Sequence, residues 1–137
     1  MNTLSNIQSI YFVGIGGIGM SALARFAIKK NLAVFGYDKT QTALTATLEK
    51  EGADITFEDS VSSLPPKVKN NTSTLVVYTP AIPEDNKILQ WFIQQDYRVI
   101  KRAEFLGELT QDTLCLAVAG THGKTTTSAI LGHLLAY

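Results

Sequence analysis

The glycine-rich segment at residues 14–19 constrains the fold of this chain more than any other feature. It has the spacing G-x-G-x-x-G, follows the β-branched and aromatic run 7–13, and opens the helical pattern 18–30. Glycines at these positions permit a tight turn, then close approach of a diphosphate to the backbone, then close packing of helix on strand. The unpaired N–H groups and positive dipole end of the helix would face the phosphates. The segment therefore predicts a turn that binds a nucleotide diphosphate.

Strand-like and helix-like segments alternate along the rest of the chain. Apolar runs predict strands at 33–37, 54–57, 75–78, 98–100 and 114–118. Helical periodicity predicts helices at 42–51, 83–95, 103–109 and 125–135, and residues 58–73 form a loop with one helical turn at its start. Short loops between alternating elements imply an α/β fold with a Rossmann-like, doubly wound parallel sheet. A ligand should bind beyond the carboxyl ends of its strands, at loops 14–19, 38–40 and 79–82.

Asp38 ends the second predicted strand, at the separation from the glycines where dinucleotide-binding domains carry an acidic residue. Its carboxylate could accept hydrogen bonds from a ribose hydroxyl or from the N–H of a base. Glycines also occur at purely structural turns, so the motif gains its meaning from the strand, the helix and Asp38 together. The ligand stays open at this point, because NAD, FAD and a UDP-sugar all carry a diphosphate.

A second glycine-rich loop, AGTHGKTT at residues 119–126, follows the strand predicted at 114–118 and leads into the last predicted helix. In a phosphate loop the backbone N–H groups wrap the phosphates, Lys124 reaches the β and γ oxygens, and the Thr125 hydroxyl can ligate Mg²⁺. The common form has glycine where this chain has Val118. We predict an ATP-binding loop that begins a second domain at residues 111–137, after a first domain at 1–110.

Composition and charge exclude several classes of protein. Twelve Lys and Arg balance twelve Asp and Glu, so no basic surface is expected for nucleic acid or for an anionic membrane. The single cysteine, Cys115, cannot form an internal disulfide, which is typical of a reducing compartment. The apolar stretch 11–28 contains Arg25 and several glycines, and residues 1–8 lack the features of a signal peptide. We expect a cytoplasmic protein.

The two motifs together resemble the Mur ligase family, in which a UDP-binding Rossmann-like domain precedes a central ATPase domain and a third domain. The resemblance rests on VGIGGIGMSALA (13–24), GYDKT (36–40), VVYTPAIPEDN (76–86), RAEFLGEL (102–109) and AVAGTHGKTTT (117–127). The form GTHGKTT is specific to the family, and GIGGIGMSALA is typical of its alanine-adding branch. The tripeptide-recycling branch shares the second motif but usually differs in the first.

The resemblance implies an ADP-forming ligase of peptidoglycan biosynthesis with ATP and Mg²⁺ as cofactors. ATP would phosphorylate the lactyl carboxylate of UDP-N-acetylmuramate, and the amine of L-alanine would attack the acyl phosphate. Carried over by position, the UDP-sugar site comprises Gly14, Ile15, Gly16, Gly17, Ile18, Gly19, Asp38, Lys39, Thr40, Thr79, Ala81 and Ile82. The ATP site comprises Gly120, Thr121, His122, Gly123, Lys124, Thr125 and Thr126.

Within that ATP site, the resemblance makes Lys124 and Thr125 the catalytic residues and Thr125 the Mg²⁺ ligand of the full-length protein. Many relatives carry Ser-Ser-Ala-Ile where this chain has Thr79-Pro80-Ala81-Ile82, which leaves the contacts there open. Arg102 and Glu104 match the family either as an ion pair at the domain junction or as substrate contacts.

The chain ends at Tyr137, one predicted helix beyond the phosphate loop. From this polypeptide we expect binding of the UDP-sugar at most, no ligase activity and no tightly bound cofactor. The apolar face of the last helix, which includes Ile130 and Leu134, could promote self-association. Two other classes stay open: an NAD-dependent oxidoreductase domain that uses Asp38 on the adenosine ribose, and a regulatory nucleotide-sensing module.

Overall fold

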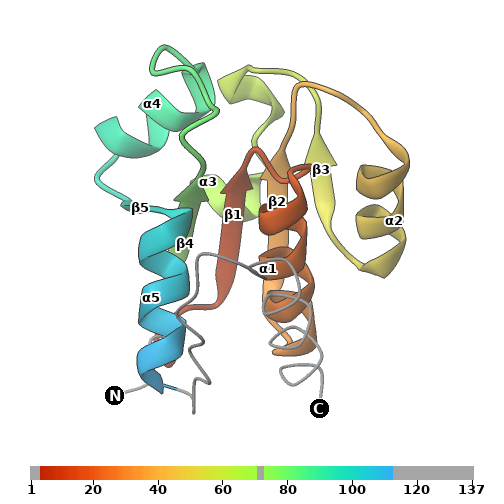
Figure 1. The fold of residues 1–137 in the computed structure, drawn as a ribbon. Coiled ribbons are helices and arrows are strands. Elements are labelled where there is room, and N and C mark those ends of the chain that lie inside the picture. The colour runs from red at the N-terminus through yellow and green to blue at the C-terminus, as the bar shows by residue number, and fades with distance from the viewer. Residues whose placement is uncertain (1–3, 71–72, 113–137) are drawn as a thin grey trace.

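The computed structural model describes residues 4–70 and 73–112, which form one parallel sheet between helices (Figure 1). The strands are β1 (Ser9–Val13), β2 (Ala33–Tyr37), β3 (Asp54–Thr56), β4 (Thr74–Tyr78) and β5 (Arg98–Lys101). The helices are α1 (Ile18–Lys29), α2 (Ala43–Glu51), α3 (Pro66–Lys69), α4 (Lys87–Gln94) and α5 (Arg102–Asp112), with a 3₁₀ turn η1 (Val61–Ser63). The predicted α/β class with an all-parallel sheet is confirmed.

The strand order is β3-β2-β1-β4-β5, and every neighbouring pair is parallel. The chain builds outward from β1 to β3, then crosses back to place β4 on the other side of β1. This reversal makes the carboxyl ends of β1 and β4 a topological switch point, where Rossmann-like sheets bind their ligands. The loops after β1, β2 and β4 therefore lie at one end of the sheet, on adjacent strands.

Strand β1 is buried on both faces and divides the core into two layers. Ile10 and Phe12 pack with the buried sides of α1, α2 and α5, whereas Tyr11 and Val13 pack with α3 and α4. This alternation follows from the two-residue period of a strand. Each large apolar side chain buried in this way contributes roughly 1.5–3 kcal/mol through the hydrophobic effect. The sheet is therefore a rigid base for the loops at its carboxyl end.

Helix α4 begins later than predicted. Pro83 suggested a helix from residue 83, because proline is favoured at the first helical position. In the structure Asn86 caps α4 by accepting from the Leu89 N–H at 2.9 Å. The Asp59 carboxylate, which follows β3, accepts from the Lys87 and Ile88 N–H groups at 3.1 Å each. These polar side chains fix the start of the helix at Lys87.

Other differences from the predicted elements are small. Helix α3, with Pro66 in its first turn, lies in a segment predicted as loop apart from one turn at its start. Helix α5 continues to Asp112, beyond the predicted end at residue 109. No helix in the described ranges is long and apolar enough to cross a membrane. The strand predicted at 114–118 and the helix predicted at 125–135 lie outside the described residues. So does the domain predicted at 111–137, apart from residues 111 and 112, which belong to α5.

Candidate nucleotide-diphosphate site

The turn after β1 is held by hydrogen bonds to β2. The N–H groups of Gly14 and Ile15 both donate to the Tyr37 carbonyl, at 2.7 and 3.0 Å, and the Gly17 N–H donates to the Gly14 carbonyl at 3.3 Å. Gly14 has φ +94°, a conformation that favours glycine. A Cβ there would also lie 2.9 Å from the Thr79 Cγ2 atom. The first glycine is therefore required both by the backbone and by the approach of the loop after β4.

Asp38 is bound to the glycine turn rather than turned away from it. The Gly16 N–H donates to Asp38 Oδ2 at 2.8 Å, and the Thr40 N–H donates to Asp38 Oδ1 at 3.0 Å. A Cβ at Gly16 would lie 2.7 Å from Oδ2 and 3.1 Å from the Thr45 Cγ2 atom. The carboxylate thus occupies the space in front of Gly16. The spacing of the motif did not indicate this contact.

Gly19, the third glycine of the motif, lies against Arg102, a contact that the sequence did not indicate. Close packing of α1 on a strand was expected at Gly19, but a Cβ there would overlap the Arg102 guanidinium at the start of α5. The glycine that permits close packing in this region is Gly36 on β2, where a Cβ would lie 2.6 Å from the Ile15 Cδ1 atom. The expectation for Gly19 is therefore wrong in its physical reason.

The amino end of α1 lacks the caps that close other helices of this domain. Gly17 precedes the helix and gives no side-chain cap, and the first turn holds no acidic residue. The N–H groups of Ile18, Gly19 and Met20 have no acceptor among the residues described. By contrast, a reciprocal Thr42–Thr45 capping box closes α2. Free N–H groups and the helix dipole make such an end favourable for an anion.

Two further observations bear on this helix end. The Ile18 side chain is 88% exposed, which places an apolar group in solvent beside the free N–H groups. Arg102 belongs to neither of the ion pairs found within residues 4–70 and 73–112, which are Arg25–Glu51 and Arg98–Glu108. An ion pair was one of two roles considered for Arg102 and Glu104, and none joins these two residues within this part of the chain. Arg102 instead brings positive charge to a helix end that is already positive.

The loop after β4 forms a turn that its own threonine stabilises. Thr79 Oγ1 accepts from the Ala81 N–H at 2.9 Å, and the Thr79 carbonyl accepts from the Ile82 N–H at 3.1 Å. The Ile82 side chain is half-buried and faces Gly14, so it joins this loop to the glycine turn. On the other side, Lys39 and Thr40 are exposed beside Asp38. The structure thus brings the predicted UDP-sugar residues to one end of the sheet.

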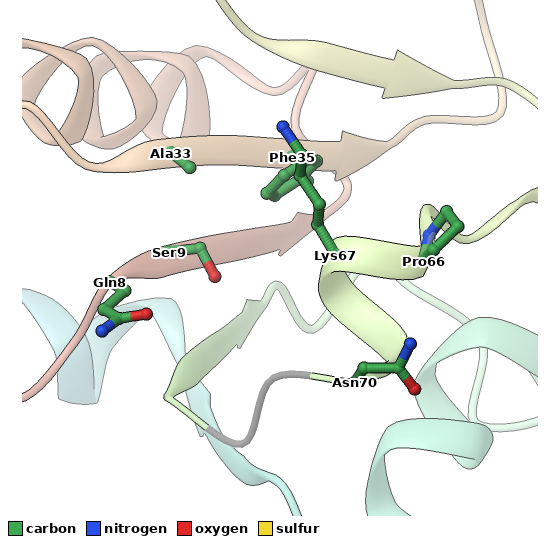
Figure 2. Close-up of a pocket in the computed structure, with 7 residues that line it drawn as sticks. All are labelled: Gln8, Ser9, Ala33, Phe35, Pro66, Lys67 and Asn70. Carbon is green, nitrogen blue, oxygen red and sulfur yellow. The ribbon is translucent and has the colours of Figure 1, made fainter.

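A cavity of about 590 Å³ lies away from this end (Figure 2). Its lining residues are Gln8, Ser9, Ala33, Phe35, Pro66, Lys67 and Asn70. Gln8, Ser9 and Ala33 lie at the amino ends of β1 and β2, so this cavity is at the opposite end of the sheet from the glycine turn. No group of His, Cys, Asp and Glu suited to a metal ion occurs in the described part of the chain. The predicted ATP-site residues 120–126 lie outside that part.

The strand order, the glycine turn and the uncapped helix end are those of a Rossmann-like domain. The family model described as "Mur ligase family, catalytic domain" matches residues 9–113. The chain belongs to the Mur ligase family, as its motifs indicated.

Two similar proteins of known name belong to one branch of the family. UDP-N-acetylmuramate–L-alanine ligase of Christiangramia forsetii is 52% identical over 98% of this chain and 30% of its own length. The protein of the same name from Flavobacterium psychrophilum is 54% identical, over 96% of this chain and 29% of its own length. The chain thus spans less than a third of these relatives.

Solved structures agree with the fold. UDP-N-acetylmuramate-alanine ligase of Thermotoga maritima has a TM-score of 0.76 at 33% identity, over 93% of this chain and 29% of that one. A murein peptide ligase of Psychrobacter arcticus has a TM-score of 0.74 at 29% identity, over 95% of this chain and 26% of that one. The sheet and helices described above are therefore a shared architecture of this family.

Proposed function

We propose that this chain supplies the UDP-N-acetylmuramate-binding part of an ATP-dependent, ADP-forming ligase that adds L-alanine to that sugar in peptidoglycan biosynthesis. Relatives 46–54% identical to this chain carry the name UDP-N-acetylmuramate–L-alanine ligase. The observation that carries the proposal is the uncapped amino end of α1, with Arg102 beside it. A helix end that presents free N–H groups next to a guanidinium is suited to a diphosphate.

The hydrogen-bond pattern supports a particular position for the diphosphate. The N–H groups of residues 14–17 are already bonded within the protein, to Tyr37, Asp38 and Gly14. The free donors are those of Ile18, Gly19 and Met20. We therefore place the diphosphate over the first turn of α1, where the Arg102 guanidinium adds charge-assisted donors. In this arrangement the glycine turn shapes the site, and α1 with Arg102 binds the ligand.

The uridine and the sugar would extend to either side of that position. Lys39 and Thr40, exposed after β2, are our candidates for the nucleoside, and Thr79, Ala81 and Ile82 border the site from β4. Thr79 keeps its hydroxyl hydrogen available, because Oγ1 acts as an acceptor in the turn. The Ile18 side chain offers an apolar contact at the same place.

The proposed chemistry belongs to the whole protein. The γ-phosphoryl group of ATP would move to the lactyl carboxylate and release ADP, and the amine of L-alanine would displace phosphate to form an amide. We assign ATP binding to Gly120–Thr126, with Lys124 and a Thr125-bound Mg²⁺ to neutralise charge on the transferring group. A cytoplasmic location is part of the same proposal.

Calorimetry and thermal unfolding of this chain with UDP-N-acetylmuramate, UDP and NAD test the proposed ligand. Ligand at 100 times its Kd should raise the unfolding free energy by about 2.7 kcal/mol, a shift of several degrees. We expect both uridine compounds to stabilise the protein and NAD to have no effect. Stabilisation by NAD alone would instead support an oxidoreductase domain and contradict the proposal.

A second candidate is the murein peptide ligase, because two solved structures of that activity have TM-scores of 0.74. Their identities to this chain are 29% and 26%, below the 52% of the first alanine ligase above. One of the two is UDP-N-acetylmuramate:L-alanyl-gamma-D-glutamyl-meso-diaminopimelate ligase of Neisseria meningitides, whose name begins with the same sugar nucleotide. The proposed ligand of this domain is therefore common to both candidates. Full-length protein assayed for ADP release with L-alanine and with the tripeptide separates the two functions.

A further inference from the structure

We infer that Asp38 is a positioning residue, which holds the glycine turn in the shape that binds a diphosphate, and not a group that binds the ligand. The inference rests on the proposed function, since it assigns a role within that site. An acidic residue after the second strand of such a sheet is usually expected to bind a ribose. In this chain the arrangement of hydrogen bonds points elsewhere.

Both oxygens of the Asp38 carboxylate are bonded to backbone donors. Oδ2 accepts from the Gly16 N–H at 2.8 Å, and Oδ1 accepts from the Thr40 N–H at 3.0 Å. Hydrogen bonds to a charged acceptor are stronger than neutral ones. The carboxylate therefore joins the turn after β1 to the loop after β2.

The turn needs such a brace because glycines are flexible. Gly16 and Gly17 stand together in it, and glycine loses more conformational freedom on folding than any other residue. Behind the carboxylate, the Thr45 methyl group also approaches Gly16. Thr45 is fully buried and is fixed in the first turn of α2 by its hydrogen bonds to Thr42. The brace thus has a rigid support.

The direction of the Gly16 N–H has a consequence for the ligand. Because Asp38 draws that N–H toward β2, the free donors are confined to the first turn of α1. The two N–H groups bonded to the carboxylate also offset its repulsion of a diphosphate. Removing Asp38 should therefore disorganise the phosphate-binding turn while leaving contacts to the nucleoside almost unchanged.

Three ligands distinguish this positioning role from ribose binding. The chain is titrated calorimetrically with UDP, inorganic pyrophosphate and uridine, as wild type and as Asp38→Ala. We expect Asp38→Ala to weaken the binding of UDP and of pyrophosphate by a similar factor of about ten or more, the effect of losing a strong hydrogen bond. The affinity for uridine should change little. If the affinities for UDP and uridine fell but that for pyrophosphate did not, Asp38 would contact the ribose. If pyrophosphate bound more tightly, Asp38 would act only by repelling it. Either result would overturn the inference.

The conservative variant Asp38→Asn tests whether a neutral acceptor restores the affinity for pyrophosphate. Its amide oxygen can still accept from Gly16, and the exposed Thr40 N–H can turn to water. We expect Asp38→Asn to recover most of the lost pyrophosphate affinity. Asp54→Asn, an exposed aspartate on β3, is the matched control and should equal wild type. An Asp38→Asn variant as weak as Asp38→Ala would contradict the proposed acceptor role.

An NMR measurement without ligand keeps the inference separate from the proposed function. The Gly16 amide proton should resonate downfield in wild type and exchange slowly with solvent, because it is bonded to a carboxylate. In Asp38→Ala this resonance should move upfield and exchange faster. An unchanged Gly16 amide would refute the brace even where UDP binds. A changed Gly16 amide with no binding of any uridine compound to wild type would uphold the brace and refute the proposed ligand.

Discussion

The Arg102 guanidinium lies over Gly19, in the space that a Cβ at this position would occupy. The first turn of α1 and the start of α5 are far apart in the sequence but meet at this point. A larger residue at position 19 and the present position of Arg102 therefore exclude each other. Because both residues border the free N–H groups of α1, the contact connects a packing requirement to the proposed binding of a diphosphate.

Gly19→Ala should separate stability from binding. Alanine is favoured over glycine in a helix by roughly 1 kcal/mol, so the folded state should be as stable as wild type or more so. The new methyl group displaces Arg102, and UDP affinity should fall about tenfold, as in Arg102→Ala. Calorimetry of both single variants and the double variant measures the coupling. Strictly additive losses would show that Gly19 acts without Arg102.

Gly36→Ala should destabilise the domain. A Cβ at this position on β2 would lie 2.6 Å from Cδ1 and 2.8 Å from Cβ of Ile15. Overpacking of this kind typically costs about 1–3 kcal/mol. Urea denaturation measures the loss. The matched control is Gly107→Ala in α5, where a Cβ meets nothing within 4 Å, and which should stabilise by roughly 0.5–1 kcal/mol. Equal effects at the two glycines would contradict the packing argument.

The sheet could be predicted from the sequence because its signals are local. The run 33–37 was predicted and found as β2, since a short apolar segment between polar loops suits a buried strand. The parallel arrangement followed from strands that alternate with helices over short connections. The same reasoning predicted that the loops after β1, β2 and β4 lie together, because carboxyl ends of neighbouring parallel strands share one end of the sheet.

The contacts within the site could not be predicted, because they join residues with no sequence relationship. Asp38 and Gly16 are 22 positions apart, and Asp59 reaches the start of α4 over 28 and 29 positions. Sequence spacing predicts that Asp38 is near the glycine turn but not that its oxygens face the backbone. The position of Arg102 over Gly19 depends in addition on how α5 follows β5. Such details are set by packing after the chain has folded.

Tyr11→Phe should stabilise the domain. The Tyr11 hydroxyl is buried and has no hydrogen-bond partner in the described part of the chain, and burial raises the pKa of Tyr11 far above its ordinary value. Leaving a buried polar group unpaired costs about 1–3 kcal/mol, which phenylalanine avoids in the same shape. Tyr97→Phe is the control in which stability should fall, because the Tyr97 hydroxyl donates to the Val68 and Lys69 carbonyls at 2.7 and 2.9 Å. Chemical denaturation should show a gain for Tyr11→Phe and a loss for Tyr97→Phe; a loss in both would mean that water satisfies Tyr11.

Asp59→Ala should loosen the amino end of α4. The Asp59 carboxylate is the acceptor for the Lys87 and Ile88 N–H groups, so its loss leaves two helix donors without their partner. By analogy with the loss of a cap, the unfolding free energy should fall by about 0.5–2 kcal/mol. Amide hydrogen exchange should locate the effect at the first turn of α4 and leave α1 unchanged. Glu58→Ala is the neighbouring control: it removes an exposed carboxylate next to Asp59 and should alter neither quantity. If Glu58→Ala lowered stability as much as Asp59→Ala, the effect would come from charge in this loop and not from the two hydrogen bonds.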